Sequence, residues 1–364
     1  MANKICELCL SPDLGGLELY MMRASRYFGE ECISVINEKG KLKSYYEDTS
    51  YCYFTLKRRN VLLSWLSARH LAKIIDDEEI DVLHLHWTKD LLLAIMAKLL
   101  SKRKPRVVQS RHMTMTRFKD DFYHRFLYKN LDMMLAVTQQ VKGQIEKFVP
   151  VEICPKIEVL YLGAEQPTLI NAEEKQERRE QLGLGESFTV GIVGRIEPPK
   201  GQWVLIDAIE KLIHQGIDAK ALIVGHAMND EYLEVLQKDV IICGLKDRII
   251  FTGFTSEAQV MMQLCDVMVL ATENETFGLV LIEAMMCSVC VVASDSGGPL
   301  EIIDDRVNGL LFKTFDADDL ADNLIRLQKN SELRENYAMA GKQKALEKFE
   351  SQKQFKFLHK IFGE

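Results

Sequence analysis

Short apolar segments alternate with helix-like segments along the whole 364-residue chain, and this alternation constrains the fold more than any other feature. Predicted strands of the first half lie at residues 4–10, 32–37, 82–86, 107–111, 133–137 and 157–160. Those of the second half lie at 189–193, 219–224, 249–252, 267–270 and 289–293. Such alternation predicts parallel sheets with helices on both faces. We therefore expect an α/β protein with two Rossmann-like, doubly wound domains that face each other across a cleft.

The alternation stops near residue 166 and restarts near 187, which predicts the domain organisation. A first Rossmann-like domain is expected at 1–165, and 166–186 should form a linker rich in charged residues. A second Rossmann-like domain follows at 187–345. The segment 346–364 predicts a terminal helix with Phe355, Leu358, His359 and Phe362 on one face, packing back on the N-terminal domain.

Charge is unevenly distributed within a composition that is ordinary for a globular protein. Residues 1–165 contain 25 Lys and Arg against 21 Asp and Glu, and the remainder contains 21 against 32. The small basic excess fits an anionic partner or membrane surface for the first half, or simply a solvated surface. It is too small to indicate nucleic-acid binding.

The nine cysteines and the apolar segments bear on location. An odd number of cysteines and a start without a signal peptide predict a reducing, cytoplasmic compartment. The pairs Cys6/Cys9 and Cys287/Cys290 lie in apolar runs, so core thiols are expected rather than a zinc site.

No apolar run reaches the roughly 18 residues of a membrane span. Segments 61–75 and 91–100 should face the core or, alternatively, lie on a membrane at the inner face of the cell membrane.

Two glycine-containing turns are candidate anion sites. Gly15 and Gly16 follow the first strand and precede a helix, where backbone amides can approach an anion or simply make a tight turn. The dinucleotide fingerprint G-x-G-x-x-G is absent, which argues against an NAD or FAD enzyme.

After strand 189–193 comes Gly194-Arg195, with Lys200-Gly201 before a helix. Two cations at a helix start can hold a diphosphate without a metal, or can be solvated surface charges.

A pair of glutamates eight residues apart forms the third motif. Glu275 precedes a helix predicted at 280–286, and Glu283 lies within that apolar helix. A carboxylate there needs hydrogen bonds, which ligand hydroxyls or a structural salt bridge would supply. An Asp-x-Asp at Asp316–Asp318 is read as a helix N-cap and not as a metal site.

Together these segments resemble the retaining glycosyltransferases of family 4, which have the GT-B fold. Six motifs occur in the family's order: Gly15-Gly16-Leu17-Glu18; Asp81 with His84-Leu85-His86; Gly194-Arg195 with Lys200-Gly201; Glu275 to Glu283 with Phe277-Gly278; Ser296-Gly297-Gly298-Pro299-Leu300-Glu301; and Asn308-Gly309-Leu310-Leu311. Leu162-Gly163-Ala164-Glu165 and Ala271-Thr272 depart from the family pattern, which puts donor choice and hinge behaviour in question.

The resemblance implies roles for individual residues. Catalytic roles fall to His112, Arg195, Lys200 and Glu275, although a histidine such as His112 is otherwise an ordinary core or surface residue. Donor-binding roles fall to Gly15, Gly16, Gly194, Arg195, Lys200, Phe254, Glu275, Thr276, Phe277, Gly278, Leu279 and Glu283. Among these, Phe254 would contact the nucleobase and Glu283 the ribose.

The resemblance also implies the reaction. A hexosyl unit would move from a UDP- or GDP-linked sugar to a hydroxyl of a glycan or lipid-linked glycan, in lipopolysaccharide or other surface-glycan synthesis. The N-terminal domain at 1–165 would bind this acceptor. No metal and no cofactor beyond the nucleotide-sugar donor are expected. Alternatives are a sugar-nucleotide epimerase of the same fold and a non-catalytic sugar-nucleotide-binding protein.

Overall fold

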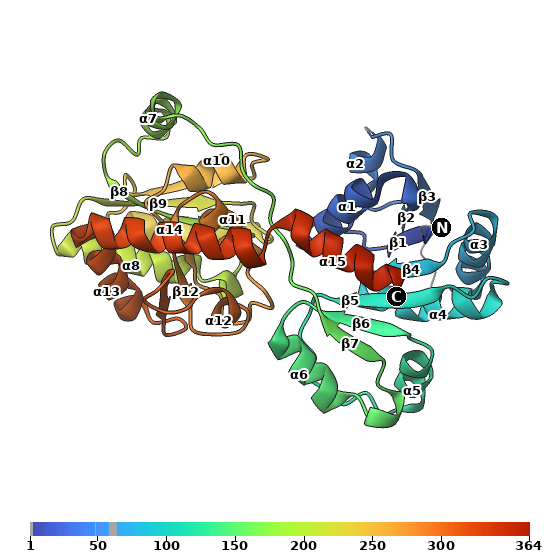
Figure 1. Ribbon diagram of the computed structural model, residues 1–364. Coiled ribbons are helices and arrows are strands. Elements are labelled where there is room, and N and C mark those ends of the chain that lie inside the picture. The colour runs from blue at the N-terminus through green and yellow to red at the C-terminus, as the bar shows by residue number, and fades with distance from the viewer. Residues whose placement is uncertain (1–2, 48, 58–63) are drawn as a thin grey trace. The chain divides into compact units, whose positions relative to one another are not determined.

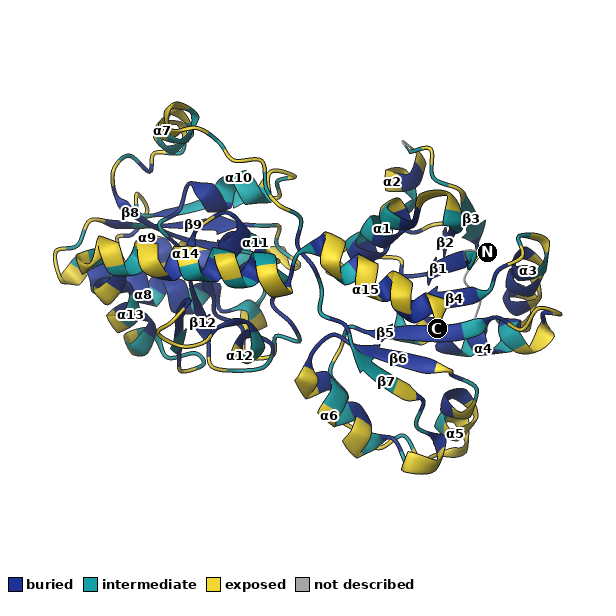
Figure 2. Ribbon diagram, in the orientation of Figure 1, coloured by how far each residue is buried: buried dark blue, intermediate teal, exposed yellow. Residues whose placement is uncertain are grey.

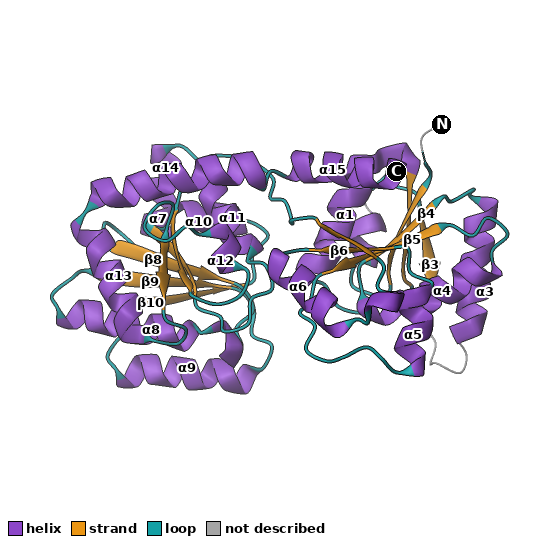
Figure 3. Cartoon of the chain, turned by 60° about the horizontal axis from the view of Figure 1, so that its bottom comes forward, coloured by secondary structure: helices purple, strands orange, loops and turns teal. Residues whose placement is uncertain are grey.

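The computed structural model describes residues 3–47, 49–57 and 64–364 and divides the chain into two compact units. The first comprises Met1–Leu162 with Gln352–Glu364, and the second comprises Gly163–Ser351. Each unit is a parallel sheet with helices packed on its faces (Figures 1 and 3). The family of folds expected from the alternation is confirmed: both units are doubly wound and Rossmann-like.

The sheet of the first unit has seven strands in the order β3-β2-β1-β4-β5-β6-β7. They are β1 (Ile5–Cys9), β2 (Cys32–Asn37), β3 (Tyr53–Leu56), β4 (Val82–Leu85), β5 (Arg106–Arg111), β6 (Met133–Ala136) and β7 (Lys156–Val159). The helices are α1 (Gly16–Phe28), α2 (Lys43–Glu47), α3 (Ser64–Asp77), α4 (Leu91–Leu100), α5 (Phe122–Lys129), α6 (Gln139–Phe148) and α15 (Ser351–Gly363).

The second unit has a six-stranded sheet in the order β10-β9-β8-β11-β12-β13. Its strands are β8 (Phe188–Val193), β9 (Ala219–Val224), β10 (Ile249–Gly253), β11 (Val267–Leu270), β12 (Cys290–Ser294) and β13 (Leu310–Phe312). Its helices are α7 (Ala172–Gln181), α8 (Gln202–His214), α9 (Asp230–Ile242), α10 (Ala258–Gln263), α11 (Leu279–Met286), α12 (Pro299–Ile302), α13 (Ala317–Lys329) and α14 (Ser331–Lys348).

Central strands are buried on both faces, as Figure 2 shows for both sheets. Every residue of β1, β4, β11 and β12 is buried, which explains their nearly continuous apolar sequences. All eleven predicted strands match observed strands to within about two residues. Two strands were not predicted, the half-buried edge strand β3 and the three-residue strand β13. Several helices were not predicted either, among them α7, which has no buried residue.

The chain passes between the units at residues 162–163 and 351–352. Residues 166–186, predicted as a linker, therefore lie in the second unit and contain α7, whose N-cap Asn171 accepts a hydrogen bond from the Glu174 amide. The final helix also divides differently, because residues 346–351 belong to the second unit and only Gln352–Glu364 to the first.

Helix α15 packs on the first unit through Phe355, Leu358, Ile361 and Phe362, each at most 3% exposed. Its end is fixed by two hydrogen bonds to carbonyl oxygens, from the Asn3 side chain to Phe362 and from Arg106 to Ile361. The prediction that His359 shares the buried face is wrong. The side chain of His359 is 46% exposed and its Nε2 lies 3.1 Å from Glu31 Oε2.

Several further expectations can be compared with the structure. Cys6, Cys9, Cys287 and Cys290 are buried free thiols, as predicted. Asp316 is an N-cap, because its carboxylate accepts from the amides of Asp318 and Asp319. Helix α4 buries Leu91, Leu93, Ala94, Ile95 and Ala97, so it faces the core. The predicted segment 61–75 is observed from Ser64, and its first three residues lie outside the described part. No described helix has the length and apolarity needed to cross a bilayer.

Candidate functional site

The loop after β8 is held by direct backbone packing. Gly201 has φ +70° and is the N-cap of α8, and a Cβ there would collide with the carbonyl oxygen of Ala271. Gly225 has φ +145°, and a Cβ there would collide with the carbonyl oxygen of Gly194. Gly194 itself has φ +154° with open space where a Cβ would be. The glycines thus fix the path of the loop, which keeps an open edge at Gly194.

The two cations of this loop have different environments. Lys200 Nζ lies 3.1 Å from Glu275 Oε2, and the two side chains are 26% and 20% exposed. Arg195 is 53% exposed and contacts Glu197 at 3.0 Å, while its carbonyl oxygen accepts from Gln202 Nε2. The structure therefore brings Lys200 and Glu275 together across 75 residues of sequence. Arg195 lies on the same loop with its charge in solvent.

The loop that carries Glu275 is clamped by a second glycine pair. A Cβ on Gly297 or Gly298 would collide with the carbonyl oxygens of Glu275 and Phe277, respectively. The Gly298 amide donates to the Glu275 carbonyl at 2.8 Å. Gly278 has φ +100° and is the N-cap of α11. The pair Gly297-Gly298 thereby positions both the Glu275 backbone and the start of α11.

The remaining predicted donor residues of the second unit differ in burial and in the elements that carry them. Glu283 lies on α11 and is half-buried, as is Thr276. The Phe277 side chain is 3% exposed and packs edge-on against Phe349, so only its backbone is suited to a ligand. Leu279 is the first residue of α11. Phe254 is 69% exposed beyond β10, where an aromatic ring can stack on a base.

Gly15 and Gly16 form the turn into α1 of the first unit. A Cβ on Gly15 would lie 3.4 Å from Glu18 Oε2, whereas the surroundings of Gly16 are open. Gly15 is the N-cap of α1 in an extended conformation, and a Cβ on Gly16 would meet nothing within 4 Å. The fold of this unit does not require glycine at position 16. A requirement for glycine there would have to come from a bound ligand.

Four polar side chains, Glu7 of β1, His84 of β4, His86 just after β4 and Ser110 of β5, continue into His112 as one chain of hydrogen bonds. His84 Nε2 lies 2.9 Å from Ser110 Oγ, and His84 Nδ1 lies 3.1 Å from Glu7 Oε1. His86 Nε2 lies 2.5 Å from Glu7 Oε2, and His86 Nδ1 lies 3.3 Å from His112 Nε2. Glu7, His84 and His86 are at most 1% exposed. The predicted residue His112 is thus the outer end of a buried network.

Burial and pairing act in opposite directions on Glu7. Burial favours the neutral carboxyl, but the charge of and hydrogen bonds from His84 and His86 outweigh it and lower the pKa of Glu7 to about 2. Burial and the neighbouring His84 lower the pKa of His86. Burial, together with His86, His84 and Arg111, brings the pKa of His112 well below its usual value of 6.5. Glu7 is therefore ionised at neutral pH, and His86 and His112 are uncharged.

Aromatic side chains pack against the histidines of the network. Tyr20 of α1 contacts the rings of His86 and His112 edge-on, with centroids 5.6 and 5.5 Å apart. Phe355 and Phe362 of α15 pack on Tyr20 and His84, respectively. The Tyr20 hydroxyl is buried without a hydrogen-bond partner among the described residues. Sequence reasoning missed Glu7 and Tyr20; a carboxylate within the otherwise apolar strand Ile5–Cys9 was the available signal.

Glu7, His84 and His86 also form the one group in the described part of the chain whose donor atoms lie close enough for a metal ion, within 4.8 Å of one another. Both carboxylate oxygens already accept from imidazole nitrogens at 2.5–3.1 Å. We therefore interpret the group as a hydrogen-bonded cluster.

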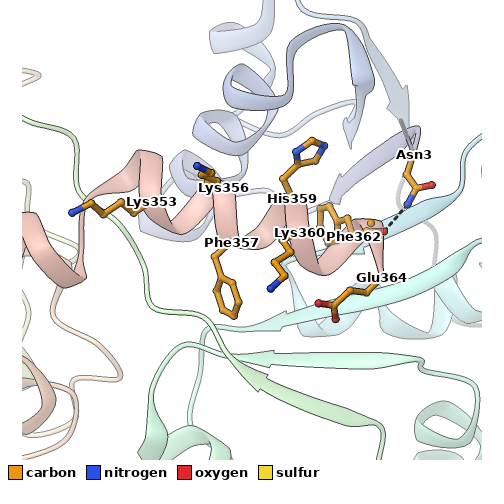
Figure 4. A pocket seen from close by; sticks show the side chains of 9 residues that line it. Asn3, Lys353, Lys356, Phe357, His359, Lys360, Phe362 and Glu364 are labelled. Atoms are coloured by element: carbon orange, nitrogen blue, oxygen red, sulfur yellow. Dashed lines mark hydrogen bonds between the residues drawn. The ribbon is translucent and has the colours of Figure 1, made fainter. Parts of the chain in front are cut away.

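Two other surface features lie on the first unit. Large apolar side chains are exposed on the segment after β5 and on α5: Met113, Phe118, Phe122, Tyr123 and Phe126, with exposures of 37–89%. Exposed Arg117, Arg125 and Lys129 accompany them. A groove along α15 is lined by residue 3 and by residues of 353–364, including Lys353, Lys356 and Lys360 (Figure 4). None of the residues that line this groove is a predicted site residue.

Comparison with known proteins agrees with this architecture. Residues 174–344 match the family model "Glycosyl transferases group 1", and residues 7–141 match "Glycosyl transferase 4-like". N-acetyl-alpha-D-glucosaminyl L-malate synthase of Bacillus anthracis is 27% identical over 293 residues, covering 79% of this chain and 75% of that protein. The lipopolysaccharide core biosynthesis mannosyltransferase LpcC of Rhizobium leguminosarum bv. viciae is 26% identical over 200 residues, 54% of each chain.

Solved structures share the fold at low sequence identity. Anabaena Alr3699/HepE in complex with UDP superposes with a TM-score of 0.87 at 22% identity, covering 99% of each chain. A glycosyltransferase from Rickettsia africae superposes with a TM-score of 0.88 at 18% identity, covering 99% of this chain and 98% of that chain. The fold and the two family matches define a glycosyltransferase of the GT-B class. The chain belongs to the family 4-type glycosyltransferases.

Proposed function

We propose that this glycosyltransferase moves a hexosyl unit from a UDP- or GDP-linked sugar to an acceptor hydroxyl, with retention at C1 and without a metal ion. The observation that carries the proposal is the contact between Lys200 and Glu275 beside the start of α11. It joins a cation suited to phosphate with a carboxylate suited to sugar hydroxyls. Anabaena Alr3699/HepE, which shares the fold, has been solved in complex with UDP and with UDP-glucose, which supports a nucleotide-sugar donor.

The chemistry follows from where charge develops. Cleavage of the C1–O bond places negative charge on the departing diphosphate and positive charge on the sugar ring. Lys200, Arg195 and the first amides of α11 would stabilise the diphosphate, in place of a metal. Glu275 would accept from hydroxyls of the transferred sugar, and Glu283 from those of the ribose. The family resemblance also gives His112 and the backbone of Gly16 roles toward the transferred sugar.

We further propose that the acceptor is a surface glycan, in lipid-linked form, and that the first unit binds it at the inner face of the cell membrane. The relative LpcC is named for lipopolysaccharide core biosynthesis. Exposed aromatic residues beside exposed Arg and Lys on the segment 113–129 are suited to an anionic lipid surface. Nine cysteines without a disulfide support a cytoplasmic location.

Donor binding tests the first proposal. Calorimetric titration with UDP, GDP, ADP and NAD, in the presence of EDTA, should show binding of UDP or GDP. A Glu283→Ala variant should bind that nucleotide about tenfold more weakly because it lacks the ribose acceptor. A Glu275→Ala variant should keep nucleotide affinity and lose most of its transfer rate. Binding of NAD alone, a dependence on added metal, or full transfer by Glu275→Ala would each contradict the proposal.

Vesicle binding tests the proposed membrane contact. A Phe118→Ser/Phe122→Ser variant should bind vesicles containing phosphatidylglycerol several-fold more weakly than the unchanged chain. The matched control is Ile241→Ser/Ile242→Ser, which removes two exposed apolar residues, 62% and 80% exposed, from the second unit. Equal loss in both variants, or no loss in either, would rule out a membrane contact through this segment.

The epimerase alternative has no support from the relatives described above, whose names state synthesis or transfer. An incubation with a donor sugar and no acceptor tests it directly. We expect no interconversion of the donor into its epimer, and the appearance of an epimer would replace the transfer reaction as the proposed activity.

A further inference from the structure

The hydrogen-bond chain that ends at His112 has a direction fixed by its central residue. An ionised carboxylate can only accept hydrogen bonds, so Glu7 Oε2, at 2.5 Å, requires a hydrogen on His86 Nε2. An uncharged imidazole carries one such hydrogen, so His86 Nδ1 is an acceptor. The atom 3.3 Å from it is His112 Nε2, which must then be the donor.

The same reasoning assigns the proton on His112. With its hydrogen on Nε2, an uncharged His112 has a lone pair on Nδ1. The direction of this arm does not depend on the other arm of the chain, because His84 donates to Glu7 through Nδ1 in either of its charge states. Tyr20 contacts His86 and Phe362 contacts His84, and both histidines are at most 1% exposed, whereas His112 is only half-buried. Water therefore competes for the outer end alone.

We propose that Glu7, acting through His86, is a positioning residue that holds His112 as its Nε2–H tautomer and so presents Nδ1 as a hydrogen-bond acceptor to a hydroxyl of the bound sugar. The role of His112 toward the sugar rests on the proposed function; the tautomer does not. Specificity follows from this arrangement. A donor sugar with a hydroxyl at that position is favoured over one whose corresponding group cannot donate a hydrogen bond.

Nitrogen-15 NMR of the ligand-free chain, labelled at histidine, tests the tautomer directly. The signals of His112 are identified by their loss in a His112→Phe variant. We expect a protonated Nε2 and an unprotonated Nδ1 at pH 7. A hydrogen on Nδ1, or on both nitrogens, would overturn the proposal even if the chain binds UDP or GDP as expected. Absence of nucleotide binding would instead contradict the proposed function and leave the tautomer result intact.

A Glu7→Gln variant tests the positioning role. The glutamine side chain has one accepting atom and a donating NH₂ group, so it can no longer accept from both histidines. We expect its His112 to show a mixture of tautomers. With the nucleotide sugar selected from UDP-glucose and GDP-mannose by calorimetry, kcat should fall on the order of tenfold to a hundredfold while KM for the donor changes less than about twofold.

Two comparisons separate positioning from general loss of stability. Tyr46→Phe removes another buried hydrogen bond of the first unit, the 3.0 Å contact between Tyr46 and Ser25, and should leave the His112 signals and kcat unchanged. In a His112→Phe background, Glu7→Gln should lower kcat by less than about twofold further, because both residues act through one step. An undiminished effect of Glu7→Gln in that background would show that Glu7 acts on the fold and not through His112.

Discussion

The two units share a doubly wound parallel architecture but place their polar groups differently. Every buried acidic, basic or histidine side chain among the described residues lies in the first unit: Glu7, Glu18, His84, His86, Asp90 and Arg111. The core of the second unit buries uncharged polar residues such as Thr189 and Asn308. Its paired site residues Lys200 and Glu275 lie before the helices α8 and α11 and are partly exposed. In the first unit, buried side chains of the sheet position His112. In the second unit, close packing of backbone against backbone positions the loops that carry the site residues.

The glycines differ in the same way. In the second unit a Cβ at Gly201, Gly297 or Gly298 would collide with a carbonyl oxygen, so the fold itself requires these glycines. In the first unit Gly16 has open space around the place of a Cβ. Loop geometry in the second unit is therefore part of its stability, whereas the turn at Gly16 is free to serve a ligand. Three predictions follow this contrast from its largest effect to its smallest.

The largest effect is expected for Gly298→Ala. The added methyl group would lie inside the contact distance of the Phe277 carbonyl, which is backbone and cannot rotate away. We expect the free energy of unfolding of the second unit to fall by about 4 kcal/mol or more. Urea denaturation followed by the fluorescence of Trp203, in a chain with Trp65 and Trp87 replaced by Phe, would measure it.

The result of Gly298→Ala is informative in either direction. Binding of UDP or GDP should weaken together with stability, because the same contact sets the backbone of Glu275 and the start of α11. A change in stability below about 1 kcal/mol would show that the loop shifts easily and that the clamp is not rigid.

Acid should destabilise the first unit before the second. The lowered pKa values of His86 and His112 mean that the unfolded chain binds protons below pH 6.5 that the folded chain does not bind, so stability falls from there downward. Glu7, with a pKa of about 2 against its usual 4.5, adds a stabilisation that is complete above pH 4.5 and lost as the pH falls towards 2. Protonation of Glu7 should lower the free energy of unfolding by on the order of 3 kcal/mol.

Tryptophan fluorescence separates the units in this experiment. Trp65 and Trp87 lie in the first unit and Trp203 in the second, so a Trp203→Phe variant reports the first unit alone. Its acid transition should occur at higher pH than that of the Trp65→Phe/Trp87→Phe variant. In a Glu7→Gln background the component between pH 4.5 and 2 should disappear. If the acid transitions of all variants coincide, the buried histidines and Glu7 do not make the first unit more sensitive to acid than the second.

The contrast also explains what the sequence could predict. Continuous apolar runs such as Ile5–Cys9 and Val267–Leu270 reveal buried strands, because burial on both faces leaves no room for alternation. Edge strand Tyr53–Leu56 is half-exposed and helix Ala172–Gln181 is polar on all sides, so neither has a periodic apolar face. His359 was misplaced because helical spacing alone does not show where the buried face ends.

The candidate site divides in the same manner. Loops of the second unit are contiguous in sequence, so the Gly194–Gly201 and Glu275–Glu283 segments are visible as motifs. The contact of Lys200 with Glu275 and that of Glu7 with His86 join side chains 75 and 79 positions apart. The contact of His86 with His112 joins side chains 26 positions apart on two neighbouring strand ends. Such groups come together only through the order and register of the strands. Because register depends on how two strands pair, the sequence of one segment does not predict it.

The smallest effect on stability is expected for Gly16→Ala, which is the counterpart of Gly298→Ala. Gly16 is the first residue of α1, and its Cβ would meet nothing within 4 Å. Alanine should therefore leave the free energy of unfolding unchanged or raise it by up to about 1 kcal/mol. If this turn is reserved for the donor, the same methyl group should lower kcat/KM at least about tenfold, because it occupies space that the ligand needs. Denaturation of the Trp203→Phe chain and initial-rate kinetics measure the two quantities separately. Full activity with unchanged stability would show that the open space at Gly16 serves neither fold nor ligand, and the contrast between the glycines of the two units would then concern stability alone.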